Sequence, residues 1–377
     1  MHPGINLDST PLMRKNSAEL LNNCTFSHIE YVNFPTQEFS PLPRFRGVCL
    51  HSSFIHTFSR QFVLFPLMTS VFLLNGCSRF SMQTDFVAGS TSSFDAFLDD
   101  FFRAEVSSNT INLHFSLSHP ENYGITETPI TLGSLSEEAL AASHASLENT
   151  LAALAKYDRD ALPPSGQLTY DVLQDYLKTE LSASDLTLYD EPLRPTTGIQ
   201  SQLPVLYEEY RFRQPADVED YLALLALTGD YFDQIIRFEQ QKAQAGLFMS
   251  DYACNTLISQ CSAFTADPDQ HYLIQTFDHK IDAMSELMEE QKTLYKEKNA
   301  ALEHVLPAYT HLAAALTELL GSGKNDMGLC YFADGKDYYR YLVCHNTGSA
   351  SDLPALQDRI LEKRQSDLQQ AAALLSE

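Results

Sequence analysis

The fold class is decided by the stretch Phe277-Asp-His-Lys-Ile281-Asp-Ala-Met284-Ser-Glu-Leu287-Met288. Its apolar residues recur every three or four positions, which is the spacing of a helix with one buried stripe. A second run follows and stops at Gly321; its apolar residues are Leu302, Val305, Tyr309, Leu312, Leu316 and Leu319. We therefore predict that residues 217–320 form the helical block around which the chain is arranged, with a kink at Pro307 if the second run is one helix.

The same periodicity continues on both sides of this block and predicts a mainly α protein, a multi-helix array with irregular loops. Glycine is expected to break or bend one run at Gly229 and to cap another at Gly246. Further helices are expected to begin at Ser92 or Ser93, near Ser136, before Tyr170, at Pro215, at Ser250, at Asp267 and at Asp352.

The helix expected after Asp352 carries its apolar pattern to Leu375, and the chain stops at Glu377 while that pattern is still running. An amphipathic helix needs a surface against which to bury its apolar side. We therefore expect residues 94–377 to be an incomplete domain, the N-terminal part of a larger helical one.

The 377 residues carry a formal net charge of -24, and nearly all of the acidity lies after Cys77. A nucleic-acid backbone would be repelled by such a surface unless a basic patch were present, and the sequence shows none. Nucleic acid is therefore excluded as an expected partner.

An uncharged segment at Phe62–Leu74 follows Arg60 and leads into Leu74-Asn-Gly-Cys77. It is too short to span a bilayer as a helix and suits the apolar region of a signal peptide. The Leu-Asn-Gly-Cys end resembles the lipobox of bacterial lipoproteins, in which the cysteine is lipidated. We predict a signal peptide at 60–77, lipidation at Cys77 and a membrane-anchored lipoprotein on the bacterial cell surface. The alternative is a buried apolar strand with an incidental cysteine.

The segments that flank this signal follow from it. Residues 78–93 are rich in Ser and Thr, and they fit a linker between anchor and folded body. Residues 1–59 precede the place where a signal peptide normally begins, so we expect a non-native or disordered extension from an over-extended translation start.

No complete catalytic set is visible in the sequence. Gly321-Ser-Gly-Lys324 lacks the first glycine and the Ser/Thr of a phosphate loop. His304 and His311 are seven residues apart, whereas metal-binding helices more often place histidines one turn apart. The four cysteines after Cys77 show no paired metal spacing, and small buried side chains are expected at Cys254, Cys261, Cys330 and Cys344.

The polar and aromatic stretch Gly321–Gly348 is the best candidate for a site. Tyrosines supply a flat stacking surface and a hydroxyl donor, and loops on a rigid scaffold often carry function. We therefore predict a possible substrate cleft with Gly335, Tyr338 and Tyr339 in one wall. The alternative is a turn that closes two helices, with both tyrosines packed.

Several segments together resemble one bacterial family, the domain of unknown function 885. The likeness runs from about Phe94 to the C-terminus. It rests on Pro192-Leu-x-Pro195-x-x-Gly198-x-Gln200-x-x-Leu203-Pro204, Asp217-Val-Glu-Asp-Tyr-Leu222, Gly246-Leu-Phe-Met249, Pro307-Ala-Tyr309, Gly335-Lys-Asp-Tyr338-Tyr339 and Thr347-Gly348.

This resemblance implies a helical protein similar to zinc metallopeptidases, with a peptide substrate and zinc in the full-length member. The family's zinc motif, a His-Glu followed by Pro-Gly-His, lies in the C-terminal half, before which this chain ends. We therefore expect no metal ligand and no cofactor in this chain, which alone would be inactive. The alternative function is that of a non-catalytic helical binding lipoprotein.

Overall fold

The computed structural model describes residues 93–299, 301–325, 327–349 and 352–376, all within one compact unit, Ser59–Glu377. The predicted extension, signal peptide, lipidated Cys77 and nearly all of the linker lie outside the described residues. Every regular element among the described residues is a helix, so the predicted mainly α class is confirmed. None of these helices combines the length and apolar character needed to cross a membrane.

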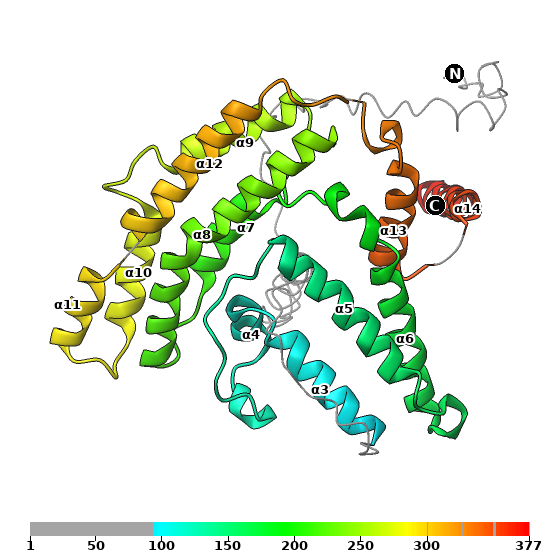
Figure 1. The fold of residues 1–377 in the computed structure, drawn as a ribbon, viewed down its shortest axis with the longest axis horizontal. Coiled ribbons are helices and arrows are strands. Elements are labelled where there is room, and N and C mark those ends of the chain that lie inside the picture. The colour runs from blue at the N-terminus through cyan, green and yellow to red at the C-terminus, as the bar shows by residue number, and fades with distance from the viewer. Residues whose placement is uncertain (1–92, 300, 326, 350–351, 377) are drawn as a thin grey trace. The chain divides into compact units, whose positions relative to one another are not determined.

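The described helices are named as in Figure 1. The α-helices are α3 (Phe94–Val106), α4 (Thr110–Ser116), α5 (Glu137–Leu154), α6 (Pro164–Leu181), α7 (Ile199–Glu209), α8 (Pro215–Ala245), α9 (Asp251–Phe264), α10 (Tyr272–Ala283), α11 (Glu289–Glu297), α12 (Leu306–Leu319), α13 (Gly335–Thr347) and α14 (Leu353–Ser376). Short 3-10 turns and one π-helical turn, Ala301–Val305, connect some of them.

Helix α8 is the longest described element, with 31 residues, and the main core forms around it. It begins at Pro215, where the missing N–H costs nothing, and ends at Gly246, whose φ of 75° is the left-handed conformation of a glycine cap. Gly229 was expected to break or bend this run, and a break is wrong because α8 continues through it. Buried residues continue at helical spacing on both sides of this glycine, and their packing keeps the helix intact.

Helices α9 and α12 pack on each other, and α12 also packs on α8 (Figure 1). Their facing sides carry fully buried residues such as Phe232, Leu257 and Leu312. Burial of a large apolar side chain contributes about 1.5–3 kcal/mol, so this layer contributes substantially to the stability of the core around α8.

The run that begins at Phe277 is not one helix, as the spacing had indicated. Helix α10 ends at Ala283, Met284 is extended with ψ 105°, and α11 begins at Glu289. The two shorter helices pack against each other, and Met284 and Leu287 in the turn are buried. Tertiary packing has therefore overridden a local pattern that two helices satisfy as well as one.

Pro307 is the second residue of α12, immediately after the π-helical turn Ala301–Val305. A proline in the first turn gives up an N–H that has no intrahelical partner there. The expected kink at Pro307 is therefore replaced by a change of helix type just before it.

A second, smaller core joins α3, α5 and α6. Ser93 and Ser136 cap the first two helices through their hydroxyls, as predicted. The core itself consists of Phe94, Phe97, Leu154, Tyr170, Leu173 and Leu177.

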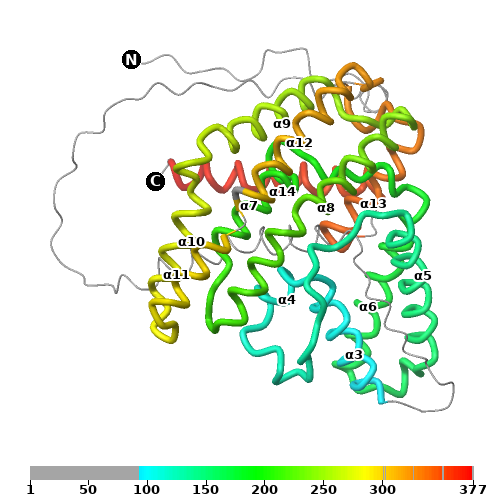
Figure 2. The backbone as a smooth tube through the Cα atoms, turned by 60° about the vertical axis from the view of Figure 1, so that its left-hand side comes forward, coloured from blue at the N-terminus to red at the C-terminus, as the bar shows by residue number. Residues whose placement is uncertain are grey.

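The C-terminal helices differ sharply from this core. Residues 335–347 were expected to be part of a loop but form α13. This helix begins after Asp334 and ends at Gly348. Helix α13 packs on α6, whereas nearly all of the described side chains of α14, the red coil in Figure 2, are exposed.

Candidate functional site

The segment that links Asp190 to α7 is shaped by Gly198. Its N–H donates to the Arg194 carbonyl at 3.0 Å, and the next N–H donates to the Pro192 carbonyl at 2.9 Å. A Cβ on Gly198 would lie 2.1 Å from the Arg194 nitrogen, closer than side-chain atoms can approach. Only glycine fits this close approach, so the motif around it specifies the loop.

The same loop is held by helices from later in the chain. Gln200 on α7 donates from its amide to the Arg194 carbonyl at 2.6 Å and to Gln260 of α9 at 3.0 Å. Gln260 in turn donates to the Pro195 carbonyl at 2.7 Å, and the Tyr309 hydroxyl of α12 donates to the Gln200 carbonyl at 2.8 Å. The loop is therefore part of the rigid layer formed by α8, α9 and α12.

Asp190 is where this loop meets α8 and α13. Its Oδ1 lies 3.4 Å from the Arg194 guanidinium and 3.4 Å from the Tyr338 hydroxyl. The Lys242 ammonium of α8 donates to its backbone carbonyl. We call Asp190, Arg194, Glu239, Lys242 and Tyr338 the Asp190 cluster. The Asp190 and Arg194 side chains are 42% and 33% exposed, so they reach solvent while the other three are buried.

Glu239 is the least satisfied member of the cluster. It is fully buried on α8, three residues before Lys242, and neither carboxylate oxygen has a hydrogen-bond partner. Burial raises the pKa of Glu239 to about 7, and the nearby Lys242 ammonium opposes that shift. A carboxyl group with this pKa can hold or release a proton near neutral pH.

Of the predicted cleft residues, Gly335 and Tyr338 are both buried and lie one turn apart on α13, whereas Tyr339 is exposed. Gly335 is buried, and its added Cβ would lie 1.8 Å from the Leu329 carbonyl oxygen. Tyr338 is buried, with its ring 5.6 Å from that of Tyr189, and reaches Asp190. Tyr339 is 53% exposed. Packing therefore accounts for Tyr338, as in the alternative interpretation, and a substrate contact at any of the three stays a prediction.

A second set of polar contacts ties α13 to α6. The Glu180 carboxylate of α6 lies 2.6 Å from His345 Nδ1, and the Tyr341 hydroxyl donates to it at 3.3 Å. The hydrogen bond that the His345 ring makes to the Glu180 carboxylate raises the pKa of His345. These contacts fix the helix that carries Tyr338.

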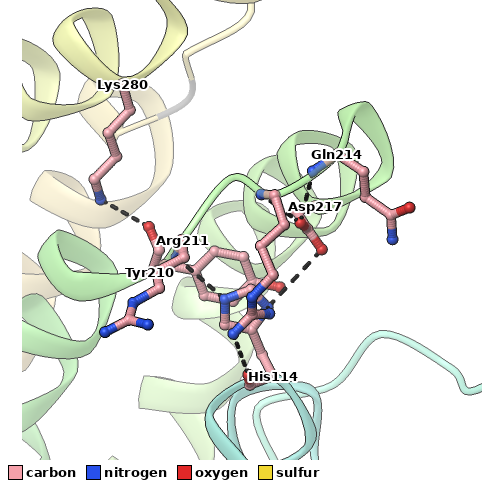
Figure 3. A network of polar contacts seen from close by, with 7 residues as sticks. His114, Tyr210, Arg211, Gln214, Asp217 and Lys280 are labelled. Carbon is pink, nitrogen blue, oxygen red and sulfur yellow. Dashed lines mark hydrogen bonds and ion pairs between the residues drawn. The ribbon is translucent and has the colours of Figure 1, made fainter. Parts of the chain in front are cut away.

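Figure 3 shows a different network, where α4 meets the start of α8. We call His114, Tyr210, Arg211, Arg213 and Asp217 the His114 network. The His114 ring stacks on Tyr210, with centroids 3.6 Å apart. Its Nε2 accepts the Arg211 N–H at 3.1 Å, and the Asp217 carboxylate accepts the Arg213 N–H at 2.7 Å. Burial, followed by the positive charge of Arg213, lowers the pKa of His114 to about 3.

A hollow of about 470 Å³ lies next to this network, between residues 208–213 and residues 280–286. Lys280 projects there, but its ammonium donates to the carbonyls of Tyr207, Glu208 and Tyr210, and so closes the end of α7. Burial lowers the pKa of Lys280 to about 8. The groups of this network serve helix ends, so we assign it a structural role.

Among the described residues no three His, Cys, Asp or Glu side chains converge as a metal centre would require. His311 pairs with Asp233 at 3.4 Å. Cys254 and Cys261 are buried as expected, whereas Cys330 and Cys344 are partly exposed, contrary to expectation. The described residues thus do not form a complete zinc centre by themselves.

The comparisons with known proteins bear on this arrangement. The family model described as "Bacterial protein of unknown function (DUF885)" matches residues 122–377. The chain belongs to the DUF885 family. The matched range contains the whole Asp190 cluster and α14. The segments that carry the resemblance are those that build the loop after Asp190, cap α8 and begin α13.

A solved structure adds the fold of a longer protein. The chain is similar to the crystal structure of "the putative lipoprotein from Colwellia psychrerythraea", with 18% identity and a TM-score of 0.59. The match covers 72% of this chain and 47% of that one, so this DUF885 chain spans about half the length of the Colwellia protein. The search of curated proteins found no match.

Sequence reasoning missed most of the Asp190 cluster. Asp190, Tyr338 and the pair Glu239 and Lys242 come from three distant parts of the sequence, and only Tyr338 was singled out. One signal was available: Glu239 and Lys242 stand on the side of α8 that also buries Phe232, Ile235 and Phe238. Charged residues in a buried stripe are rare unless they are paired or functional.

Proposed function

We propose that this chain is the N-terminal portion of a surface-anchored, zinc-dependent, metallopeptidase-like hydrolase of unknown substrate. The observation that carries the proposal is the match to the DUF885 family model, which extends to residue 377. The match to the Colwellia structure covers only 47% of that protein, so the proposal places the rest of the enzyme outside this chain. The name of that protein supports the lipoprotein part of the proposal. The peptidase part rests on the similarity of the DUF885 family to zinc metallopeptidases.

In this proposal the zinc ligands come from outside the described residues. Bound zinc would activate water and polarise the scissile carbonyl. The part described here would contribute binding and orientation. Asp190 and Arg194 are the solvent-facing groups of the cluster, and a carboxylate beside a guanidinium can bind the amide groups or the charged end of a peptide.

The buried members of the cluster would hold those two groups in place. Lys242 binds the Asp190 carbonyl, and Tyr338 reaches its carboxylate. Glu239 lies beneath them with a pKa of about 7. Site groups supported by a buried second layer keep their orientation without reorganisation when a substrate arrives.

Two measurements test the proposal. The gene is read downstream of the codon for Glu377, where an in-frame His-Glu segment followed by Pro-Gly-His is expected. The purified 377-residue chain is analysed for zinc by mass spectrometry and for hydrolysis of a mixed peptide library, and neither stoichiometric zinc nor hydrolysis is expected. Tight one-to-one zinc binding by this chain would show that its own residues hold the metal and would overturn the proposal.

If the longer product hydrolyses peptides, Asp190→Asn is expected to raise KM at least tenfold with a smaller change in kcat, because it removes a binding charge. Asp337→Asn, an exposed aspartate paired with Arg340 on α13, is the matched control. An unchanged KM in Asp190→Asn would remove the cluster from the binding site.

The second candidate function is a helical binding lipoprotein without chemistry. It is favoured by the Asp190 cluster itself, whose solvent-reaching carboxylate and guanidinium suit the binding of a polar ligand. An immediate stop codon after Glu377, together with peptide binding by the 377-residue chain, would support it over the hydrolase.

A further inference from the structure

Helix α14 is exposed along nearly its whole length. Among its described side chains only Leu353, Leu356 and Ser366 are partly covered. Its large apolar residues face solvent, with exposed fractions of 59% at Ile360, 48% at Leu361, 54% at Leu368, 74% at Leu374 and 89% at Leu375. An isolated helix is marginally stable in water, and an uncovered apolar face of this size marks a contact surface.

The spacing of these exposed apolar residues along α14 indicates that the partner is another helix. Leu361, Leu368 and Leu375 are seven residues apart, so they lie on one side of α14, and Ile360 and Leu374 widen the apolar surface on one flank, each turned by about 100° from its sequence neighbour. A leucine every seventh residue, flanked by further apolar residues, is the seam that another helix covers by side-chain interdigitation. We call this side of α14 the α14 seam.

The charges of α14 differ from those of the whole chain. Three acidic residues, Asp358, Glu362 and Asp367, are balanced by three basic ones, Arg359, Lys363 and Arg364. The chain as a whole carries -24. A second copy approaching the seam would bring the same large negative charge, and the two bodies would repel. A segment of the same polypeptide meets no such barrier, since covalent linkage raises its effective concentration.

The comparisons with known proteins indicate where such a segment would come from. The family model matches through α14 to residue 377, so this helix lies within the family domain. The Colwellia protein has about half of its length outside the matched part. We propose that the α14 seam is the surface on which a helix from that remaining part of the DUF885 fold packs, within one polypeptide. This inference rests on the proposed function, because it requires the chain to continue.

The test compares two proteins, the 377-residue chain and the longer product read from the gene. Amide hydrogen exchange is measured along α14 in both. Amides of residues 360–375 are expected to exchange at least tenfold more slowly in the longer product, because the covering helix must open before they exchange. Leu368→Glu in the longer product is expected to abolish that protection. Gln369→Glu, which adds the same charge at an exposed position that lies away from Ile360, Leu368 and Leu374, is expected to keep it.

The outcomes separate this inference from the function on which it rests. A longer product that carries the zinc motif, but exchanges α14 amides as fast as the 377-residue chain does, overturns the α14 seam and leaves the hydrolase standing. Protected α14 amides in a longer product without zinc or hydrolysis overturn the hydrolase alone. An immediate stop codon overturns both. A dimer of the 377-residue chain in sedimentation, dissociated by Leu368→Glu, assigns the seam to a second copy and overturns the inference.

Discussion

The His114 network and the Asp190 cluster both include charged residues of α8, but they differ in whether their buried polar atoms have hydrogen-bond partners. No buried side-chain atom of the described His114 network lacks a hydrogen-bond partner, whereas both oxygens of Glu239 do. A satisfied network fixes one arrangement, whereas a buried carboxyl group without a partner costs free energy, a cost that proteins retain mainly at functional sites. The comparison indicates a structural role for the His114 network and is in keeping with the binding role proposed above for the Asp190 cluster.

The two regions also titrate in opposite senses. The folded state keeps His114 neutral down to a pKa of about 3, so the unfolded state binds the proton first and stability falls as pH drops below 6.5. The folded state keeps Glu239 protonated up to a pKa of about 7, so the unfolded state loses the proton first and stability falls as pH rises from 4.5 to 7.

The largest expected effect comes from breaking the loop that holds the Asp190 cluster. Gly198→Ala is expected to lower the free energy of unfolding by about 4 kcal/mol or more, because the new methyl group overlaps the Arg194 backbone. Urea denaturation followed by circular dichroism measures it, and soluble yield serves if the variant does not fold.

Gly229→Ala is the matched control. A Cβ there meets nothing within 4 Å, and the residue lies inside α8. Alanine in place of glycine in a helix is expected to raise the free energy of unfolding by about 0.5–1 kcal/mol. Equal stability of the two variants would contradict the close approach at Gly198.

The next largest effect is expected in the His114 network. His114→Gln loses the stack on Tyr210 and the aligned acceptor for the Arg211 N–H, and should cost about 3 kcal/mol at pH 8. The deficit should shrink by about 2 kcal/mol at pH 5, because the variant has no imidazole for the unfolded state to protonate. Denaturation at both pH values tests this, and a deficit that grows toward acid would reverse the assignment.

Glu239→Gln sharpens the comparison from the other side. The variant should match the parent near pH 4.5 and exceed its free energy of unfolding by roughly 3 kcal/mol at pH 8, because it has no buried proton to lose. Asp230→Asn, exposed on the same helix, is the control and should show no such pH-dependent gain. A loss of stability at pH 8 would mean that Glu239 acts as a paired, ionised group.

The smallest effect is expected at the two neighbouring tyrosines. Tyr338→Phe removes the hydroxyl that reaches Asp190 and should cost about 1 kcal/mol. Tyr339→Phe changes an exposed side chain and should stay within about 0.5 kcal/mol. Thermal unfolding of both variants measures the difference, and equal costs would place both tyrosines outside the cluster.

Much of the fold follows from local signals. The serines that cap α3, α5 and α9 and the glycine that ends α8 were predicted, since each satisfies backbone groups of its own helix. The errors lie where packing decides. The turn at Met284, the unbroken path through Gly229 and the helix from Gly335 all depend on partners distant in sequence.

The site was less predictable for the same reason. Gly335 and Tyr338 stand out by local composition, but Asp190 meets Lys242 across 52 residues and Tyr338 across 148. No spacing rule joins positions so far apart. The two charged residues within the buried stripe of α8 were the one local clue to the cluster.

The π-helical turn at Ala301–Val305 sets the orientation of α12, whose Tyr309 bonds to Gln200 beside the loop after Asp190, about a hundred residues earlier in the chain. Each residue turns a helix by about 100°, so deleting one residue in this turn would rotate α12 by that angle. The Tyr309 hydroxyl would then swing away from the Gln200 carbonyl, and Leu312 and Leu316 would leave the core face with it. The rotation of α12 about its own axis, which this turn sets, therefore helps to fix the position of that loop.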